Sequence, residues 1–482
     1  MNAVAGLPLY IMSAAAVVAL VLSVVPLKGM LRRLPEVTGV VGILLTLIMT
    51  VALWGDRQEA FHGNIRADRL SLLLTWVIML SALGTLALSW REPAGTGRRG
   101  EYTALVLLAA TGMMLVVTSG DLIVLFLGIE LLSVSLYVLC AIEAWRERSL
   151  EAGLKYLITG AIGTAVLIYG FALLYGMTGT TSFSGIGERL SEAGPLTSQP
   201  LLVAAIALIV VGLGFKASAV PFHMWTPDVY EGAPTPITAF MATGTKVAAI
   251  GAFLLVFTGA TQGAEPDWRV LIGSIAAITM VVGNVGALLQ TSITRMLAYS
   301  GIAQAGYLLI GVAVGTLKGA EALLYYLIAY LVMTMAAFAV VVIREREVED
   351  GDSISSFTGY GRRHPWVGLV MTIAMLSLAG FPPLSGFIGK FLLFGAAVDA
   401  DMTWLAIVGA VASAVSVVYY LRVAVVMWSP VPDAARPEKV LRVPGAVAGV
   451  AITCGVAVVG LAIWASPVLD LCRGAAETLL AP

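Results

Sequence analysis

Four ionisable side chains lie within stretches of sequence that are otherwise apolar, and they are the residues best suited to do chemistry. They are Glu130, Lys216, Lys246 and Lys390. A lysine at the centre of a membrane helix costs about 2.5–3.5 kcal/mol on insertion scales, and ionisable residues inside a membrane mark ion pathways and proton relays by default. Buried lysines also change their proton affinity readily. These residues therefore predict a proton relay inside a membrane.

The first of these lysines precedes a predicted break in its helix. Pro221 follows Lys216 closely, and proline lacks the N–H that a helix needs and clashes with the preceding turn. Irregular backbone at membrane depth is tolerated only where protein covers it or where it lines a watery cavity. His223 lies in the predicted break. It is equally well interpreted as a proton relay that titrates near neutral pH or as a side chain that satisfies local backbone carbonyls.

A second stretch resembles the first. In residues 375–394, Pro382 and Pro383 interrupt an apolar run, and Lys390 follows them. The lysine precedes the proline in the first break and follows it in the second. Paired interrupted helices in two halves of a chain point to inverted repeats that meet at an ion site, and the reversed order fits inversion.

Glu130 would tune the first lysine. Ser133 and Tyr137 lie three and seven positions after it, so all three share one face of a helix. A carboxylate near Lys216 stabilises its ammonium, whereas burial and a second ammonium such as that of Lys246 destabilise it. The alternative is a static ion pair that joins two helices.

Further polar side chains lie on the later spans without carrying charge inside the membrane. Hydrogen bonding between helices is the default role for any one of them, and a water-assisted link between the lysines is the alternative. Asp228 and Glu231, near the membrane edge, are expected to cap the next helix. The uncharged residues are Ser300, Gln304, Tyr307, Tyr326, Tyr330, Thr334, Ser413, Ser416 and Tyr420.

The composition requires a membrane protein. Of 482 residues, 59% are hydrophobic and 12% are charged, whereas soluble domains carry about 25% charged residues. We predict an all-α polytopic membrane protein of about 14 transmembrane helices that forms a single transmembrane domain over residues 1–482. The predicted spans are 8–27, 38–54, 70–90, 102–119, 121–142, 154–177, 201–220 continuing to 231, 235–258, 269–290, 296–317, 321–343, 366–399 with a break, 402–428 and 443–465.

The basic residues predict the orientation. With the N-terminus outside, the inside loops hold 17 lysines and arginines and the outside loops hold 7, so both termini are expected outside. The sequence contains no phosphate-binding loop and no dinucleotide fingerprint. Cys140, Cys454 and Cys472 are too far apart in the sequence to suggest an iron–sulfur or zinc site. The energy for any pumping must therefore come from an ion gradient or from a partner subunit.

Long motifs resemble one family. Residues 149–170, 212–249, 295–311 and 378–391 are similar to the antiporter-like membrane subunits of respiratory complex I, the proton-pumping NADH:quinone oxidoreductase, and within that family to the N-type subunits. The resemblance implies two inverted five-helix repeats (102–258 and 269–428) with two discontinuous helices, flanked by 1–90 and 443–482. It implies roles for Glu130, Lys216, Lys246 and Lys390, and it places His223 in a central water-filled path.

The resemblance also implies partners and a location. The chain is expected to bind no cofactor or metal itself, while NADH, FMN, iron–sulfur clusters and quinone belong to partner subunits of a heteromeric complex in a bacterial inner membrane. No nucleic-acid partner is expected. The alternative is a subunit of a multisubunit cation/proton antiporter that has no redox partner. A stand-alone transporter of a small solute is disfavoured, because the interior chemistry suits protons.

Overall fold

The computed structural model describes residues 4–25, 29–55, 57–90, 99–192, 199–261, 265–348, 351–430 and 443–480. The elements are η1 (Gly29–Arg33), η3 (Met241–Thr245), η4 (Leu254–Ala260), η6 (Ile354–Phe357), β1 (Gln58–Ala60), β2 (Ile65–Ala67), α1 (Leu7–Val24), α2 (Leu34–Ala52), α3 (Arg69–Leu88), α4 (Arg99–Thr118), α5 (Leu122–Cys140), α6 (Glu147–Thr178), α7 (Phe183–Glu192), α8 (Pro200–Ala217), α9 (Trp225–Gly232), α10 (Thr235–Phe240), α11 (Lys246–Phe253), α12 (Glu265–Leu288), α13 (Ile293–Val314), α14 (Leu317–Glu345), α15 (Tyr360–Arg363), α16 (Pro365–Ala379), α17 (Ser385–Asp399), α18 (Thr403–Trp428), α19 (Gly445–Ile463) and α20 (Ala465–Leu480).

The prediction of a polytopic helical membrane protein is confirmed. Within the described ranges, 13 helices are long and apolar enough to cross a membrane, and α16 is a shorter apolar helix that α17 continues after a break. Both predicted interruptions are present, because α8 ends at Ala217 before α9 begins, and α16 ends at Ala379 before α17 begins. The division into repeats at 102–258 and 269–428 stays a prediction.

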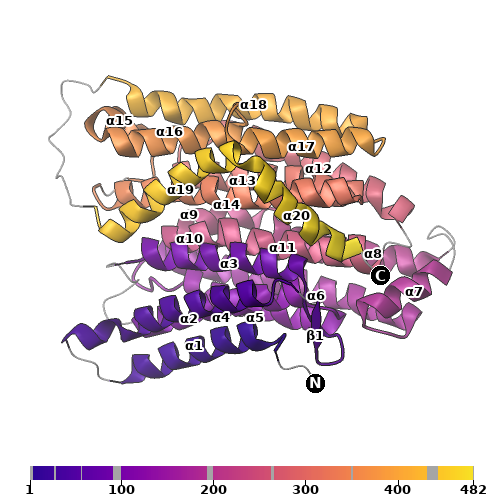
Figure 1. The fold of residues 1–482 in the computed structure, drawn as a ribbon. Helices are drawn as coiled ribbons and strands as arrows, with labels where there is room; N and C mark the ends of the chain where they lie inside the picture. The colour runs from indigo at the N-terminus through magenta and orange to yellow at the C-terminus, as the bar shows by residue number, and fades with distance from the viewer. Residues whose placement is uncertain are drawn as a thin grey trace.

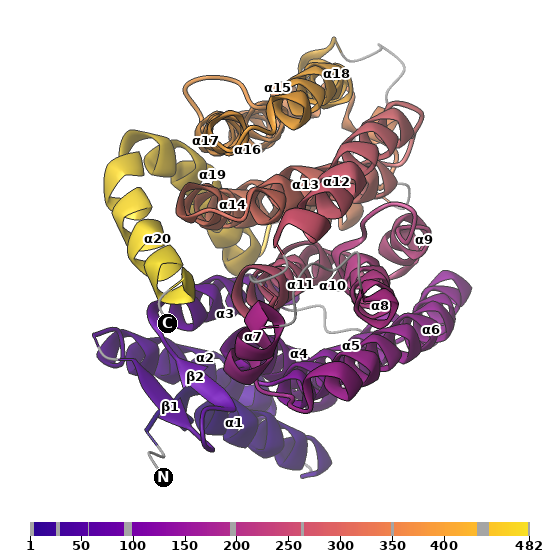
Figure 2. The ribbon, with the colours of Figure 1, turned by 90° about the vertical axis from the view of Figure 1, so that its right-hand side faces the viewer.

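Most helices lie nearly parallel to one another, while α19 and α20 run obliquely (Figure 1). α1, α2, α4 and α5 form one edge of the stack, and α16, α17 and α18 form the opposite edge (Figure 1). α13 and α14 lie between, together with the continuous span from α10 to η4. The end-on view shows α19 and α20 lying against α14 and α3, far from them in sequence (Figure 2).

One small element departs from the all-helical expectation. β1 and β2 pair antiparallel between α2 and α3, with Gln58 opposite Ala67. Their connection turns through Phe61, His62 and Gly63, all of which have positive φ. Gly120 at the start of α5 donates its N–H to the Asn64 carbonyl of this turn, at 2.9 Å. We call the end of the bundle that carries this turn the hairpin side and the other end the far side.

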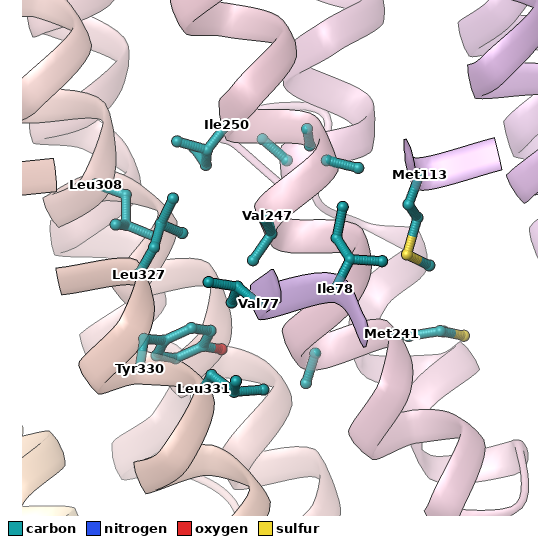
Figure 3. Packing of buried hydrophobic residues seen from close by; sticks show 14 of the residues in the cluster. Val77, Ile78, Met113, Met241, Val247, Ile250, Leu308, Leu327, Tyr330 and Leu331 are labelled. Atoms are coloured by element: carbon teal, nitrogen blue, oxygen red, sulfur yellow. The ribbon is translucent and has the colours of Figure 1, made fainter. Parts of the chain in front are cut away.

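The core is continuous across the stack. Val77 and Ile78 of α3 meet Val247 and Ile250 of α11 on one side, and Leu308, Leu327 and Tyr330 of α13 and α14 complete the layer (Figure 3). The span Thr235–Ala260 is the most enclosed membrane span, since its apolar window is 100% buried. A helix that is apolar all round belongs at the centre of a bundle. This burial places Lys246 in the middle of the molecule.

Candidate functional site

The site begins on α5. Its N-cap Asp121 accepts the Ile123 N–H at 2.7 Å, which fixes where the helix starts. Glu130, Ser133 and Tyr137 then project from adjoining turns. The Glu130 side chain is half-buried, and its Oε1 is fully enclosed with no hydrogen-bond partner in the described part of the chain. A buried polar atom without a hydrogen bond costs free energy, so this carboxylate gains stability from any hydrogen-bond or ion-pair partner that reaches it.

Lys216 faces that surface of α5 from the last turn of α8. Its side chain is buried, and Nζ donates to Ser133 Oγ at 2.6 Å. The described residues show no ion pair between Lys216 and Glu130, although Glu130 is close enough to act on the lysine electrostatically. The structure therefore brings these two predicted residues together in an open arrangement, with a serine hydroxyl in place of the carboxylate.

The first break is built by the residues that follow Lys216. Ser218 is in the left-handed conformation with φ 61°, and the Ala219 N–H bonds the Gly214 carbonyl at 2.8 Å, which closes the end of α8. The Val220 N–H donates to Thr279 Oγ1 of α12 at 3.0 Å. The chain resumes as a helix at Trp225, whose indole N–H donates back to the Phe215 carbonyl at 3.1 Å.

Lys246 closes the open end of α8. It is 1% exposed, and its Nζ donates to the Ala217 carbonyl at 2.8 Å. The C-terminus of a helix carries partial negative charge, which an ammonium stabilises. Lys246 directly follows the π-helical turn Met241–Thr245. Such turns are frequent at functional sites, and nothing in the residue spacing had predicted this one.

Lys390 does at the second break what Lys246 does at the first. α16 ends at Ala379, followed by Gly380 in the left-handed conformation with φ 88°. Lys390 Nζ donates to the Leu378 carbonyl at 3.0 Å, to the Ala379 carbonyl at 3.3 Å and to Ser413 Oγ at 3.0 Å. Its ammonium is therefore held by the carbonyl end of a half-helix. The lysine comes from the second half of the same broken span.

A network of uncharged polar side chains fills the interior near Lys390. Tyr326 donates to Gln304 Oε1 at 2.5 Å, and Gln304 Nε2 donates to Tyr420 at 3.1 Å. Tyr420 also bonds Ser300 at 2.5 Å. The face predicted on α13 thus meets side chains of α14 and α18.

Asn284 was missed by the sequence reasoning. It accepts from Tyr419 at 2.9 Å and donates to Tyr307 at 3.3 Å. The Tyr307 ring in turn lies 4.5 Å below the Lys390 ammonium. A lone asparagine in an apolar helix gives no signal of which distant tyrosines it will join.

His223 lies in the first break but away from the hydrogen bonds of the lysines. Its ring is half-buried, and Nδ1 is enclosed without a hydrogen-bond partner in the described residues. A cavity of about 10 Å³ instead connects Lys216 with Thr245, the residue before Lys246. That volume suits one water molecule, provided polar groups hold it.

A cluster of ion pairs lies toward the far side of this break. Asp228 of α9 bonds Lys155 of α6 at 3.0 Å and Arg295 of α13 at 2.9 Å, and Arg295 also bonds Glu231 at 2.7 Å. The expectation that Asp228 and Glu231 cap the next helix was wrong, because α10 follows Pro234 without a side-chain cap. Their partners lie more than 60 residues away in the sequence, so spacing could not reveal them. The cluster ties α9 to both halves of the molecule.

Arg295→Gln is expected to weaken the attachment of α9 to α13. It removes both ion pairs of the arginine, whose side chain is 30% exposed, so the loss is about 1 kcal/mol. For a chain of 482 residues this loss lowers the melting temperature by about 1 °C. Heating membranes before a native gel of the complex measures this. The control is Lys318→Gln, which removes an exposed pair with Asp399. Equal melting temperatures of Arg295→Gln and Lys318→Gln would contradict a stabilising role for the Arg295 ion pairs.

The described residues offer no group of three or more His, Cys, Asp or Glu side chains that could hold a metal ion. The thiols of Cys140, Cys454 and Cys472 are free and lie on three different helices, α5, α19 and α20. These residues do not fit the ligand set of an iron–sulfur cluster. The polar groups that the site brings together are lysine ammoniums, the Glu130 carboxylate and hydroxyl groups such as that of Ser133.

Comparisons with known proteins identify the family of this chain. The NADH:quinone oxidoreductase/Mrp antiporter transmembrane family model matches residues 119–416. Subunit N of NADH-quinone oxidoreductase from Desulforamulus reducens is 39% identical over 440 residues, which are 91% of each chain. The subunit N from Salinibacter ruber is 42% identical over 432 residues, which are 87% of this chain and 85% of that one.

Solved structures give the same result. A chain of respiratory complex I from Thermus thermophilus has a TM-score of 0.81 and 35% sequence identity, with 97% of this chain and 100% of that chain covered. A chain of the Mrp complex from a Dietzia species has a TM-score of 0.85 at 23% identity, covering 100% of this chain and 98% of that one, and so shows a shared fold alone. The chain therefore belongs to the antiporter-like membrane subunits of the NADH:quinone oxidoreductase/Mrp antiporter family, and within them to the N-type subunits of NADH-quinone oxidoreductase, which are members of a heteromeric membrane complex.

Proposed function

We propose that this chain translocates protons across a bacterial inner membrane, driven by quinone reduction in other subunits of its complex. One observation carries the proposal. The buried Lys216 donates to the Ser133 hydroxyl, and the buried Lys246 and Lys390 donate to carbonyls at the ends of half-helices. Among the described residues, Glu130 Oε1 has no hydrogen-bond partner. A charge arrangement of this kind is costly inside a membrane unless it serves ion transfer.

The first half of the chain would load the proton. When Glu130 approaches Lys216, its carboxylate stabilises the ammonium, and when it withdraws, the buried ammonium loses that support. Lys216 can then release its proton toward Lys246, because Lys216 and Thr245, the residue before Lys246, line one small cavity, and Lys246 bonds the carbonyl next to Lys216. Water in that cavity would complete the link.

The second half would deliver the proton. From Lys246 it passes to Lys390 through polar side chains and waters, and the network around Gln304 and Tyr420 supplies hydroxyl and amide groups for that passage. Lys390 lies in α17, which runs toward the hairpin side. That is the side predicted to face outside, so release there would complete the transfer.

Partner subunits would supply the redox chemistry. Subunit N relatives belong to NADH-quinone oxidoreductases, so NADH oxidation through FMN and iron–sulfur clusters and the reduction of quinone are assigned to other chains. The residues of this chain hold and move protons at the lysine Nζ atoms. Coupling would reach them as a change in the charges that surround Glu130.

Glu130→Gln is expected to lower both donor-driven quinone reduction and proton uptake about tenfold in membrane vesicles, because the amide cannot stabilise the Lys216 ammonium as a charge does. Complex content is checked on a native gel. Glu188→Gln on α7 removes an exposed carboxylate and should behave as wild type. Wild-type proton uptake by assembled Glu130→Gln complex would refute the proposal.

A further inference from the structure

Three aromatic rings surround the Lys216 ammonium. Its Nζ lies 5.7 Å from the ring centroid of Tyr137, 5.6 Å from that of Tyr156 and 5.5 Å from that of Phe215. The rings come from three helices, α5, α6 and α8. Contacts between a cation and ring faces within about 6 Å are attractive, and most strongly so where water is excluded. We call these three residues the aromatic cage.

The cage is held together by ring contacts that continue into α9. Tyr137 meets Tyr156 edge to face at 4.9 Å, and Tyr156 stacks on Trp225 at 4.5 Å. Trp225 is the first residue of α9 and bonds the Phe215 carbonyl. α9 is in turn fixed by the Asp228 ion pairs, one of which involves Lys155, the neighbour of Tyr156. The ion pairs that Asp228 makes with Lys155 and Arg295 therefore position the cage through α9.

Glycines on α6 make the room that the cage needs. A Cβ added to Gly160 would lie 2.1 Å from Tyr137 Oη, and one added to Gly163 would lie 2.9 Å from the Phe215 ring. Any residue larger than glycine at position 160 or 163 would have to displace the ring beside it. Gly176, on the same helix, has nothing within 4 Å of such a Cβ. Gly153 and Gly170 of α6 are also closely packed, against Ala141 and Ile209, whereas Gly160 and Gly163 are the two that face rings of the cage.

We propose that the aromatic cage is a second partner of the Lys216 ammonium, which holds it whenever Glu130 is withdrawn. The switch would then be an exchange of the ammonium between two sites, the cage with Ser133 and the Glu130 carboxylate, and the present structure shows the first. This inference rests on the proposed function. It adds positioning roles for Tyr137, Tyr156 and Phe215, whose ring centroids lie 5.5–5.7 Å from the Lys216 ammonium.

Gly160→Ala tests the cage in the whole complex, with Gly176→Ala as the matched control. The new methyl group should push the Tyr137 ring out of the cage, and cryo-EM should then show Lys216 Nζ within about 4 Å of the Glu130 carboxylate. Proton uptake per quinone reduced should fall about two- to fivefold, because the open state has lost one of its ring contacts. Gly176→Ala should keep the wild-type structure and stoichiometry.

A displaced Tyr137 with Lys216 still on Ser133 and wild-type stoichiometry would overturn the cage. If the Gly160→Ala complex fails to assemble, Tyr156→Phe and Tyr156→Leu decide. The first keeps the ring and should pump normally, whereas the second should close the Glu130–Lys216 pair and lower the stoichiometry. Equal pumping stoichiometry in Tyr156→Phe and Tyr156→Leu would also overturn the aromatic cage. Loss of pumping in Glu130→Gln together with normal cage variants would refute the cage and leave the proposed function standing.

Discussion

Replacing Lys216 with alanine is expected to lower donor-driven quinone reduction and proton uptake together, to about a tenth of wild type or less, in a complex that still assembles. The side chain is buried, and its Nζ bonds Ser133 alone among the described side chains. Removing it deletes the group that Glu130 is proposed to control. Both activities should fall together, because electron transfer coupled to a blocked proton path cannot turn over freely.

Lys216→Met separates the charge from the packing. Methionine has nearly the length of lysine and fills the space between α5 and α8 without an ammonium, so its effect should equal that of alanine. Lys318→Ala serves as the control, since that lysine is exposed and pairs with Asp399 near the hairpin side. Vesicle assays of both activities, normalised to complex content on native gels, measure the outcome. Wild-type rates and stoichiometry in assembled Lys216→Met complex would make Lys216 structural.

The helices and their breaks could be predicted because they depend on local chemistry. Runs of about 20 apolar residues must form helices in a membrane, where the backbone can satisfy its hydrogen bonds only internally. Pro221 and Pro382 remove backbone donors within such runs, so the ends of α8 and α16 followed. The depth of Lys216, Lys246 and Lys390 within their spans followed from the same counting.

The partners of the charged groups could not be predicted, because partner choice is a tertiary property. Sequence reasoning offered Glu130 as the partner of Lys216, whereas the structure gives Ser133 and three rings. Sequence reasoning assigned no role to Arg295, which joins α13 to α9. The π-helical turn before Lys246 has no propensity signal, since its residues are ordinary helix residues whose hydrogen bonds shift by one position.

The two halves of the chain solve one electrostatic problem in two ways. In each half, a half-helix ends inside the membrane and leaves carbonyls that need a donor. Lys246 supplies it to Ala217 from the following span, whereas Lys390 supplies it to Leu378 from the same span, and Ser413 donates to Ala379 beside it at 3.2 Å. An ammonium that leaves either position exposes these carbonyls. The proposed proton transfer between the lysines would therefore change the electrostatics of both breaks.

Lys390→Met is expected to lower proton uptake to about a tenth of wild type or less, with quinone reduction falling in parallel, because it removes the last proton carrier before release. It also leaves the Leu378 carbonyl without its lysine donor. Since an unsatisfied buried carbonyl costs about 1–3 kcal/mol, the complex should also melt at a lower temperature than wild type.

The comparison with Lys390→Arg tests whether charge alone is enough. Arginine keeps a positive charge that can bond the Leu378 and Ala379 carbonyls, so stability should recover, but it does not release its proton in a protein, so pumping should not. Native gels after heating report the first quantity, and proton uptake in vesicles reports the second. Recovery of pumping in Lys390→Arg would show that Lys390 acts as a fixed charge, and the path would then have to end at Lys246 or at water. If the Lys390→Arg complex loses both its stability and its proton uptake, the main role of Lys390 is to close the second break.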